Sequence, residues 1–515
     1  MTEPPVEIIA EPPRSPLALR IGALAAVWGI LAAIVYFRAG LTLSHYDARG
    51  HLVVARRIAD SITPGWQQIG AVWLPLPHLL NAIPVQVDFL YRTGASAVAI
   101  SIAAYAIAAG AIGWILLMLT ASTPAAVAGA VVFALNPNVL YLQSTPMTEP
   151  LLLATTTIAV AMLIAWCQAD LKVCTTPYTG SRSAGLEACH VGWSFALACL
   201  TRYEAWPVTV AALAAAGWGR WRSGQPPGAV VREIAGIAVY PALAILGFAI
   251  FSRVVIGEWL VAGGFFVPEN KALGDPLIAV AEIGWGAQML SGTPLTWLGG
   301  AGVAIALALG LARRRHAGMP IAVALLAMAA IPWTAFLDGH PFRIRYMVPL
   351  MAIEAIGAGL VAGVLPGRRV RAAGAAALLV LAAYELRPLD ASAPMVVEAQ
   401  WDRPNAPVRA RVTACLGAPS GGDKIMASMG SLGHYMQEAA ASGFAIRDFL
   451  HEGNGDIWLA ALTGPRPFAR WVLIEEKAEG GDMLAHIARD KPSFLDGYER
   501  VCEGAGLALY RRREN

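Results

Sequence analysis

The feature that most constrains this 515-residue chain is a succession of about eleven apolar segments. A spanning helix needs about 20 mainly apolar residues, and within lipid such segments satisfy their backbone groups as helices. Charged residues make up 14% of the chain, against about 25% in a soluble domain. We therefore predict a mainly α, polytopic transmembrane bundle with the spans 17–38, 96–119, 124–141, 149–167, 189–201, 203–219, 233–254, 292–312, 319–337, 343–366 and 372–388.

Two features of this pattern need interpretation. The first apolar run is long and has no small-residue cleavage site before Asp47, so we interpret it as an uncleaved span and not as a signal peptide. The segment 189–201 is too short to cross alone, and we expect a short or broken helix, which membrane proteins tolerate where backbone lines a cavity. The formal net charge of +3 is too small to indicate a nucleic-acid partner, and we expect none.

Basic residues in short loops predict the orientation of the bundle. With eleven spans they fall on one side, expected to be cytoplasmic: Arg14, Arg20, Lys172, Arg182, Arg220, Arg222, Arg232, Arg313, Arg314, Arg315, Arg368, Arg369 and Arg371. We therefore expect a multi-pass protein of the cytoplasmic (inner) membrane with a cytoplasmic tail at 1–16. The outer side then receives the large first loop 39–95, the loops 142–148, 255–291 and 338–342, and everything after about residue 389.

The first outer loop is an exception to this charge pattern. It carries Arg49, Arg56, Arg57 and Arg92 on the outer face. Basic residues against the general trend indicate a site that handles anions, and a solvated interfacial face is the alternative.

The composition changes at about residue 389. Apolar runs shorten to strand length at 424–429, 444–449, 471–476 and 507–510, with helix-like stretches at 432–441 and 482–490 between them. We predict a small extracytoplasmic α/β domain at 389–515, separate from a membrane domain at 17–388. Its two cysteines, Cys415 and Cys502, could form a disulfide in an oxidising compartment, although sequence cannot place them within bonding distance.

The first loop opens with an amphipathic segment in which Leu52, Ala55 and Ala59 recur at helical spacing. We interpret it as a helix lying at the membrane surface, with Asp47 where that helix should start. Aspartate is a preferred N-cap residue there, and it is also a candidate base for proton transfer. His51 follows one turn later on the same face, so the two side chains could share a metal ion.

Two further polar clusters lie at the ends of predicted spans. Thr148 and Glu149 open the span 149–167, where they suit an N-cap and a first helical turn. Arg202, Tyr203 and Glu204 lie between two apolar runs. Charges in such a place are costly unless they pair with each other or face a cavity, where they could bind a phosphate and a sugar.

A last cluster, from His340 to Tyr346, ends one span and begins the next. Arg343 and Arg345 present the forked donors that suit a phosphate. Glu354 lies about two turns deeper as an isolated intramembrane acid, which indicates either a functional group or a helix–helix hydrogen bond.

All four clusters map to the outer end of an otherwise apolar bundle. Scattered structural residues have no reason to share one side, so the sequence predicts an active site there. The candidate catalytic residues are Asp47 and Glu149. The candidate substrate-binding residues are His45, Arg49, His51, Arg202, Tyr203, Glu204, His340, Arg343, Arg345 and Tyr346.

Taken in order, these motifs resemble the GT-C superfamily of polytopic membrane glycosyltransferases, which includes protein mannosyltransferase-like and aminoarabinose transferase-like enzymes. The resemblance is carried by Asp47 in the large first outer loop, by Thr148 to Leu151, by Arg202 to Glu204 and by Arg345 to Leu350. It covers about residues 17–388 and not the C-terminal region.

The resemblance implies transfer of a sugar from a polyprenyl-phosphate carrier to an acceptor hydroxyl on the outer face, usually with inversion. It implies that Asp47 is the base and that Glu149 binds acceptor or metal. Two features depart from the pattern: Asp47 has no acidic neighbour, and the Trp-Trp-Asp motif of oligosaccharyltransferases is absent. The second departure argues against en bloc transfer to asparagine.

The expected partners are a lipid-linked sugar donor, membrane lipids and a protein, lipid or glycan acceptor. No organic cofactor is expected, and the sequence leaves a divalent metal open. A transporter or lipid flippase with an extracytoplasmic sensor domain is the main alternative, and it would favour charges near the midplane and repeated halves. A non-catalytic assembly protein is a further alternative.

Overall fold

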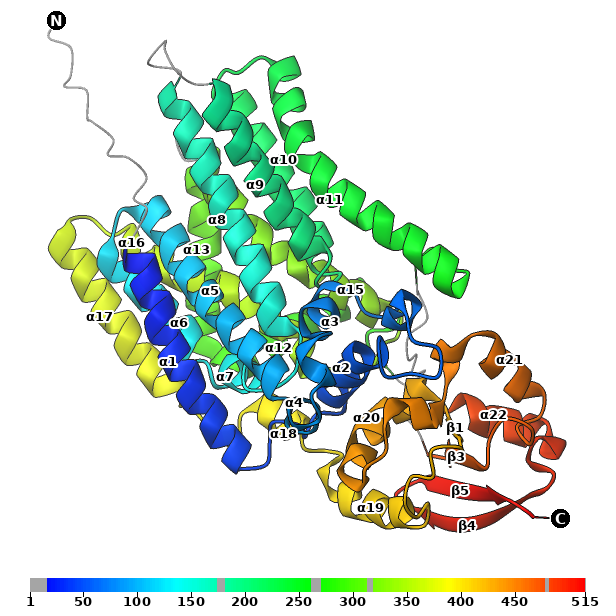
Figure 1. Cartoon of the computed structure of the whole chain (residues 1–515). Helices are drawn as coiled ribbons and strands as arrows, with labels where there is room; N and C mark the ends of the chain where they lie inside the picture. Colours follow the sequence, from blue (N-terminus) through cyan, green and yellow to red (C-terminus); the bar gives the residue numbers. More distant parts are fainter. Residues whose placement is uncertain (1–15, 174–180, 261–269, 313–317, 478–480, 515) are drawn as a thin grey trace, which may run out of the picture.

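The computed structural model describes residues 16–173, 181–260, 270–312, 318–477 and 481–514, and it shows a helical bundle joined to a small sheet region (Figure 1). Among these residues, seven helical segments are long and apolar enough to cross a membrane. They are Pro16–Arg38, Ala95–Thr120, Glu149–Ala169, Pro227–Ile256, Thr293–Ala312, Gly318–Leu337 and Ile344–Gly363. The shorter apolar helices Thr123–Leu135 and Ala188–Cys199 accompany them. The chain is an integral, multi-pass membrane protein.

The bundle is built from α-helices and short 3-10 helices (η). These are α1 (Pro16–Arg38), α5 (Ala95–Thr120), α6 (Thr123–Leu135), α7 (Pro137–Leu142), α8 (Glu149–Val173), α9 (Ser181–Cys199), α10 (Ala205–Arg222), α11 (Pro227–Ile256), α12 (Pro276–Ser291), α13 (Thr293–Ala312), α14 (Gly318–Val323), η3 (Ala324–Ala329), α15 (Ala330–Leu337), η4 (Ile344–Leu350), α16 (Met351–Gly363) and α17 (Arg368–Glu385). Every predicted span falls on one or more of them.

Two differences from the predicted spans have local causes. The segment 124–141 breaks at Asn136, because its side-chain oxygen accepts hydrogen bonds from the N–H groups of Asn138 and Val139 and so starts α7. The predicted outer loop 255–291 contains helix α12, which Asp275 caps and Pro276 begins.

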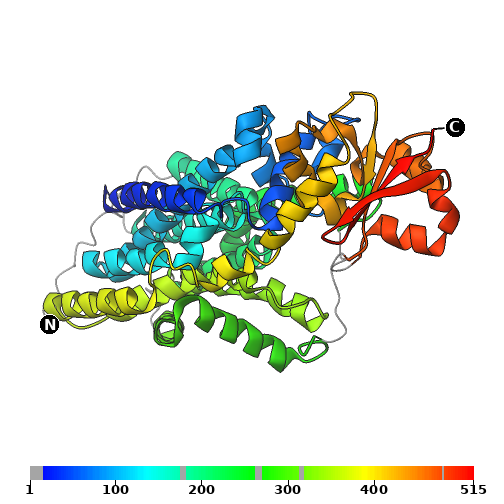
Figure 2. The same ribbon diagram turned by 90° about the horizontal axis from the view of Figure 1, so that it is seen from below.

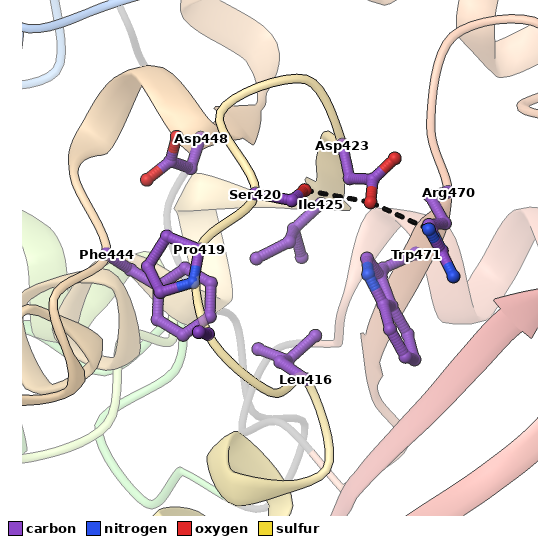
Figure 3. Close-up of a pocket in the computed structure, with 10 residues that line it drawn as sticks. Leu416, Pro419, Ser420, Asp423, Ile425, Phe444, Asp448, Arg470 and Trp471 are labelled. Atoms are coloured by element: carbon purple, nitrogen blue, oxygen red, sulfur yellow. Dashed lines mark hydrogen bonds and ion pairs between the residues drawn. The ribbon is translucent and has the colours of Figure 1, made fainter.

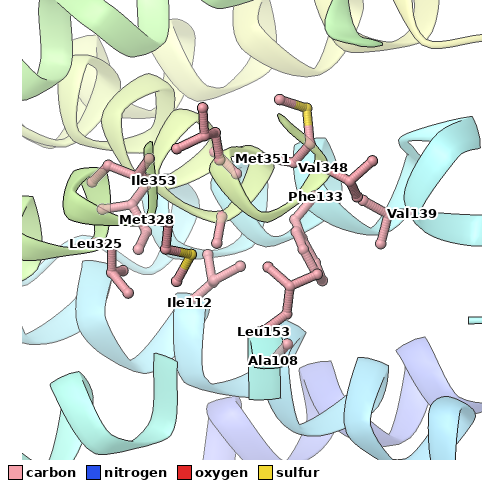
Figure 4. Close-up of a cluster of buried hydrophobic side chains, with 14 of the residues drawn as sticks. Ala108, Ile112, Phe133, Val139, Leu153, Leu325, Met328, Val348, Met351 and Ile353 are labelled. Carbon is pink, nitrogen blue, oxygen red and sulfur yellow. The ribbon is translucent and has the colours of Figure 1, made fainter. Parts of the chain in front are cut away.

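Small residues allow the helices of the bundle to approach closely. A Cβ atom on Gly302 of α13 would lie 1.9 Å from the carbonyl oxygen of Gly357 in α16, so these two backbones are almost in contact. Nearby, the Thr296 hydroxyl donates a 3.3 Å hydrogen bond to Glu354. The isolated acid of the sequence therefore makes a helix–helix hydrogen bond. Figure 4 shows part of the surrounding apolar core.

The basic clusters fall at the end of the bundle that lies away from the sheet. Figure 1 shows the α10–α11 connection and the beginnings of α1 and α17 there. Part of the predicted cytoplasmic side lies outside the described residues: the tail up to residue 15, which includes Arg14, and Arg313 to Arg315. The side chains of Lys172 and Arg182 are likewise outside the description.

The connection between α1 and α5 is a folded unit. It contains α2 (Tyr46–Arg57), η1 (Trp66–Ile69), α3 (Leu76–Asn81), η2 (Pro84–Gln86) and α4 (Asp88–Thr93). The prediction that its first helix lies at the membrane surface is wrong, because α2 is buried along nearly its whole length. Its apolar residues Leu52, Val53 and Ala55 pack in one core with the C-terminal region. The amphipathic pattern is therefore satisfied by protein and not by lipid.

The C-terminal region begins with α18 (Pro394–Glu398), η5 (Arg403–Asn405) and α19 (Ala406–Ala414). It continues as an α/β unit with β1 (Ile425–Ala427), α20 (Met429–Ala439), η6 (Ala440–Ser442), η7 (Ile446–Asp448), β2 (Phe449–Leu450), η8 (Glu452–Asn454), α21 (Asp456–Thr463), β3 (Trp471–Glu475), α22 (Met483–Asp490), η9 (Pro492–Leu495), β4 (Tyr498–Gly504) and β5 (Leu507–Arg512). The strand order is β2-β1-β3-β5-β4. The pairs β1–β2 and β1–β3 are parallel, whereas β3–β5 and β4–β5 are antiparallel.

Most of the predicted elements of this region are confirmed. Strands form within or across the predicted segments 424–429, 471–476 and 507–510, and α20 and α22 match the two predicted helices. The prediction at 444–449 is largely wrong, because η7 occupies half of it and β2 begins only at Phe449. Strand β4 was not predicted, because charged residues interrupt the apolar residues of its sequence. A disulfide joins Cys415 to Cys502, with Cα atoms 6.5 Å apart.

Helix α20 forms the main contact between the sheet region and the first loop. Leu432, Tyr435 and Met436 of α20 pack with Leu52 and Val53 of α2. Figures 1 and 2 both show α2 between the bundle and the sheet region. The first loop is therefore held from two sides, by membrane helices and by the α/β unit.

Candidate functional site

The beginning of α2 fixes the position of Asp47. His45 is the N-cap residue, and its Nδ1 accepts a 3.1 Å hydrogen bond from the N–H of Asp47. Burial and the nearby Arg345 lower the pKa of His45 to about 3, so its ring is neutral and can accept. The interpretation of Asp47 as the N-cap is therefore wrong. Asp47 lies inside the first turn, and its carboxylate is free for another partner.

That partner is Arg345, which lies in η4 at the start of a membrane span. The two side chains form an ion pair and are 10% and 11% exposed. Burial alone would raise the pKa of Asp47, but the Arg345 guanidinium outweighs it, and the pKa falls to about 2. Asp47 is therefore an ionised, masked carboxylate while Arg345 is bound to it.

A second ion-pair group joins the start of α8 to the connection between α9 and α10. Arg202 contacts Glu149 at 3.0 Å and Glu204 at 2.7 Å, and it donates a 2.9 Å hydrogen bond to the Thr148 hydroxyl. The Glu149 side chain is only 1% exposed. Both interpretations of Arg202 are compatible with this geometry, because it pairs with its neighbour Glu204 and also faces a cavity.

That cavity brings most of the sequence candidates together. It has a volume of about 110 Å³ and is lined by Asp47, His51, Trp73, Leu74, Pro77, His78, Thr148, Thr201, Arg202, Tyr203, Glu204, Arg345 and Tyr346. Glu149 is one ion pair away from its wall, through Arg202. Small-molecule sites commonly bring a few polar groups together around one cavity. The polar lining of this cavity has that character.

Sequence reasoning missed His78 and its place beside His51. Nδ1 of His51 lies 3.0 Å from Nε2 of His78, and Nδ1 of His78 lies 3.2 Å from the carbonyl oxygen of Leu74. A carbonyl only accepts, so His78 must carry its proton on Nδ1. Burial lowers the pKa of His78 to about 3, which leaves Nε2 as an acceptor. His51 then donates from Nδ1 and keeps a lone pair on Nε2.

The signal that could have found His78 is the run from Trp73 to His78, which combines a tryptophan, two prolines and a histidine within the first loop. Trp73 packs on His51, with ring centroids 4.1 Å apart. A second cavity of about 30 Å³ shares His51, Pro77, His78 and Thr148 with the first, and the rest of its lining is mostly apolar.

Besides His45 and Glu149, which support the cavity from behind its wall, three candidate residues do not line it. Arg49 forms an ion pair with Glu438 of α20. The Nδ1 of His340 lies 2.8 Å from the carbonyl of Pro341, and its Nε2 lies 3.3 Å from the Tyr346 hydroxyl. Arg343 is the N-cap residue of η4, and its charge contributes to the lowered pKa of His45. His340 and Arg343 therefore surround Tyr346 and Arg345, whereas Arg49 faces away.

The other basic residues of α2 are structural. Arg56 pairs with Asp60 at 3.0 Å and with Asp88 at 2.6 Å. Arg57 donates to the carbonyl oxygen of Gln68. Neither guanidinium lines the cavity, so these two residues do not contribute to the candidate site.

The fit of a divalent metal can be tested on the donor set. The described residues contain no group of three His, Cys, Asp or Glu side chains placed to hold a metal ion. Asp47 and Glu149 each pair with a guanidinium in this structure. A centre built from Asp47, His51 and Glu149 does not fit this arrangement, and we derive no step through a metal.

A separate cavity of about 200 Å³ lies in the α/β unit (Figure 3). Ile425 and Trp471, the first residues of the parallel strands β1 and β3, line it, and Asp423 pairs with Arg470 at 2.9 Å beside it. In open α/β sheets, ligands usually bind at the opposite, carboxyl ends of the strands. None of the predicted site residues contributes to this cavity.

No family model matches this sequence, and no curated protein matches it either. Solved structures do match the fold. ArnT from Cupriavidus metallidurans bound to undecaprenyl phosphate has a TM-score of 0.55 and 12% identity, with 94% of this chain and 97% of that chain covered. The apo state of that protein has a TM-score of 0.54 and 11% identity, with the same coverage of both chains. An oligosaccharyltransferase from Archaeoglobus fulgidus has a TM-score of 0.47 and 12% identity, with 96% of this chain and 73% of that chain covered.

The match to ArnT corrects one expectation. The predicted resemblance stopped near residue 388, but coverage of 94% of this chain must include most of the C-terminal region as well. The α/β unit is therefore part of the shared fold.

Proposed function

Because this chain has the fold of the GT-C superfamily, we propose that it is a membrane glycosyltransferase that takes a sugar from a polyprenyl-phosphate carrier. It transfers that sugar to an acceptor hydroxyl at the outer face of the membrane, with inversion. The observation that carries this proposal is the cavity in which Asp47 meets Arg202 and Arg345. These residues come from distant parts of the chain and meet at one cavity.

The donor side of the reaction needs positive charge more than a general acid. A lipid phosphate is already a good leaving group, and two guanidinium groups can bind its oxygens and stabilise the charge that develops on it. Arg202 and Arg345 both line the cavity. We propose that they bind the donor phosphate.

The acceptor side needs a base on the opposite face of the sugar ring. We propose Asp47 for this role, with Glu149 holding Arg202 in place. Tyr203, Glu204, Tyr346 and His51 also line the cavity and are proposed to contact the sugar or the acceptor. The sugar itself and the kind of acceptor, whether protein, lipid or glycan, follow from none of these contacts.

The carrier requires an apolar place beside the polar cavity. Apolar side chains are present there, since Ala97, Ile100, Met147 and Leu151 lie around a small second cavity next to His51. The ArnT structure that matches this fold holds undecaprenyl phosphate. Both observations support a polyprenyl phosphate as the carrier.

Two observations support the outer face as the place of reaction. The disulfide between Cys415 and Cys502 lies in the unit that packs on α2, and disulfides persist in oxidising compartments. The basic residues at the α10–α11 connection and at the beginning of α17 lie at the opposite end of the bundle, as cytoplasmic loops require (Figure 1). We therefore propose an inner-membrane protein with residues 17–388 as catalytic domain and 389–515 outside.

The proposal is tested with the full chain in lipid nanodiscs and a radiolabelled polyprenyl-phosphate sugar. Wild type should release polyprenyl phosphate and label a component of a membrane extract. Asp47→Asn should lower this rate by about 100-fold or more, as loss of a general base does. Asp88→Asn is the matched control, since Asp88 is in the same loop but 65% exposed and outside the cavity. Passage of the labelled lipid across liposomes without a covalent product would favour a flippase.

A further inference from the structure

The contact between Asp47 and Arg345 poses a chemical problem. A carboxylate paired with a buried guanidinium is a poor proton acceptor, and the pKa of Asp47 is about 2 in this arrangement. Burial acts in the opposite direction, since it disfavours the charged form and would raise that pKa. The basicity of Asp47 therefore depends on whether Arg345 stays bound to it.

Arg345 has capacity for a second partner. A guanidinium carries five N–H donors, and the Nε of Arg345 is buried with no hydrogen-bond partner among the described residues. The group lies over the ring of Tyr346, 5.2 Å from its centroid, and lines the cavity. A buried unpaired donor is costly, so an anion entering the cavity would satisfy it.

Arg202 is less available for such an exchange. Glu149, Glu204 and the Thr148 hydroxyl hold it at 3.0, 2.7 and 2.9 Å. Arg345 forms one ion pair with a carboxylate, and Glu149 and Glu398 interact with its charge from further away, whereas Arg202 forms two ion pairs. Both guanidiniums can contact a phosphate in the cavity, but Arg345 is the one that a phosphate can draw away from its carboxylate.

We propose that the donor phosphate draws Arg345 away from Asp47, so that Asp47 becomes a base only when the lipid-linked donor is bound. This inference rests on the proposed function of the cavity. It makes Arg345 a switch between two anions, and it predicts that donor binds before acceptor. Without donor the carboxylate stays masked, so it cannot activate water or an acceptor hydroxyl.

The other charged groups around Asp47 do not replace Arg345. His45 and His51 on α2 stay neutral, because burial lowers the pKa of each. His78 on α3 is neutral for the same reason. Arg202 from the α9–α10 connection and Arg343 from the start of η4 remain nearby as positive charges, and Arg202 is neutralised by Glu149 and Glu204.

The transfer step balances with these groups. The proton of the acceptor hydroxyl passes to Asp47 as the acceptor oxygen forms a bond to the anomeric carbon. The bond from that carbon to the phosphate oxygen breaks, and its electron pair stays on the departing polyprenyl phosphate. The donor diester has one negative charge, and the product phosphate has two. The phosphate therefore gains the one negative charge that Asp47 loses on protonation, and Arg345 lies beside the phosphate that gains it. When the product leaves, Arg345 returns and Asp47 releases its proton to solvent.

Proton uptake on binding tests this exchange. The probe is a polyprenyl methyl phosphodiester, a monoanion that does not titrate near neutral pH and carries no sugar to transfer. Calorimetry on the full chain in nanodiscs, in two buffers of different ionisation enthalpy, measures protons bound with the probe. Wild type should take up on the order of half a proton per site when the pH equals the pKa of released Asp47.

Asp47→Asn should bind the probe without this uptake. Arg345→Gln should also show none, because its Asp47 is already unmasked, and it should bind the probe about tenfold more weakly. A difference infrared spectrum of wild type at the pH values used for calorimetry gives a second measurement that needs no variant, since the band of a protonated carboxylic acid should appear with the probe as the pH falls to the pKa of released Asp47.

Binding with equal proton uptake in wild type and Asp47→Asn, or binding without the carboxylic acid band, would overturn the exchange alone. Failure of wild type to bind the phosphodiester would instead overturn the proposed function, and the inference with it. The two failures are therefore distinguishable.

Discussion

At the scale of single residues, the chemistry of the cavity depends on which side-chain nitrogen and oxygen atoms already have a hydrogen-bond or ion-pair partner. His51 donates from Nδ1 to His78, which in turn donates to the carbonyl of Leu74. This chain of contacts leaves Nε2 of His51 unprotonated toward a cavity that also contains Asp47. Free neutral histidine favours the other tautomer, so the arrangement is a property of the fold.

We predict that His78 acts through His51 and does not serve only as packing. His78→Gln keeps an oxygen that can accept from His51 and should retain donor KM and most of kcat. His78→Leu removes the acceptor and should lower kcat about 100-fold with donor KM unchanged, a typical contribution of a positioned base or its support. ¹⁵N chemical shifts should report the Nδ1–H form of His51 in wild type. Equal losses in both variants would indicate a structural role.

The ion pair of Asp47 also predicts a pH dependence of stability. Its pKa is 3.8 unfolded and about 2 in the fold. A lowered carboxyl pKa stabilises the folded state by about 2 kcal/mol at any pH above the pKa of the unfolded chain. This stabilisation is lost as the pH falls through the folded-state pKa of about 2. The Tm deficit of Asp47→Asn should therefore be largest near pH 6 and should shrink at pH 3. A deficit that is constant with pH would contradict the ion pair.

At the scale of elements, α2 is the piece that joins the two halves of the molecule. One face of it carries Asp47 and His51 toward the cavity. Another carries Arg49 to Glu438 of α20, where Arg409 of α19 also binds Glu438 at 2.6 Å and Asp402 at 2.7 Å. The α/β unit therefore fixes the helix that carries the proposed base.

Breaking this clamp should destabilise the fold and displace α2. Glu438→Gln leaves Arg49 and Arg409 short of a carboxylate, and removal of one partner from a buried pair costs about 3 kcal/mol. We expect a lower Tm in detergent and a lower kcat, although no residue of the cavity is changed. Glu499→Gln is the control, since its pair with Arg511 is 39–46% exposed and should contribute less than about 1 kcal/mol. Equal effects of the two variants would contradict a clamp.

At the scale of the whole molecule, the sheet region and the beginnings of α1 and α17 lie at opposite ends of the bundle (Figures 1 and 2). This arrangement predicts opposite accessibility of two exposed positions. Ser420→Cys in the α/β unit should react with a membrane-impermeant thiol reagent in cells whose inner membrane is intact. Arg369→Cys at the start of α17 should react only after that membrane is opened. The unmodified chain measures the background from its own cysteines, and the reverse pattern would contradict the proposed orientation.

How much the sequence revealed differed between elements. Apolar length alone predicted most helices of the bundle, because lipid admits few other backbone arrangements, but it missed α12 and the break at Asn136. Alternation and turn residues predicted β1, β3 and β5 but missed β4, whose charged residues interrupt the pattern. The surface placement of α2 was wrong, since an apolar helix face fits a protein core as well as it fits a membrane.

The residues of the candidate site were also predicted only in part. The order of the polar motifs predicted that Asp47, Arg202 and Arg345 belong together, and they line one cavity. Arg49 was expected there too, but its neighbour in space is Glu438, almost 400 residues later in the chain. Helical spacing fixes which residues share a face and gives no information on what that face meets.

The sequence by itself therefore determined the membrane bundle, the α/β unit and one common end of the bundle as the place of the polar groups, because burial of apolar surface and backbone hydrogen bonding depend on local pattern. Only the tertiary structure decided the partners: Arg345 on Asp47, His78 on His51 and α20 on α2. These contacts join segments far apart in the chain. Charge and tautomer at the site are set by such neighbours and not by the residues alone.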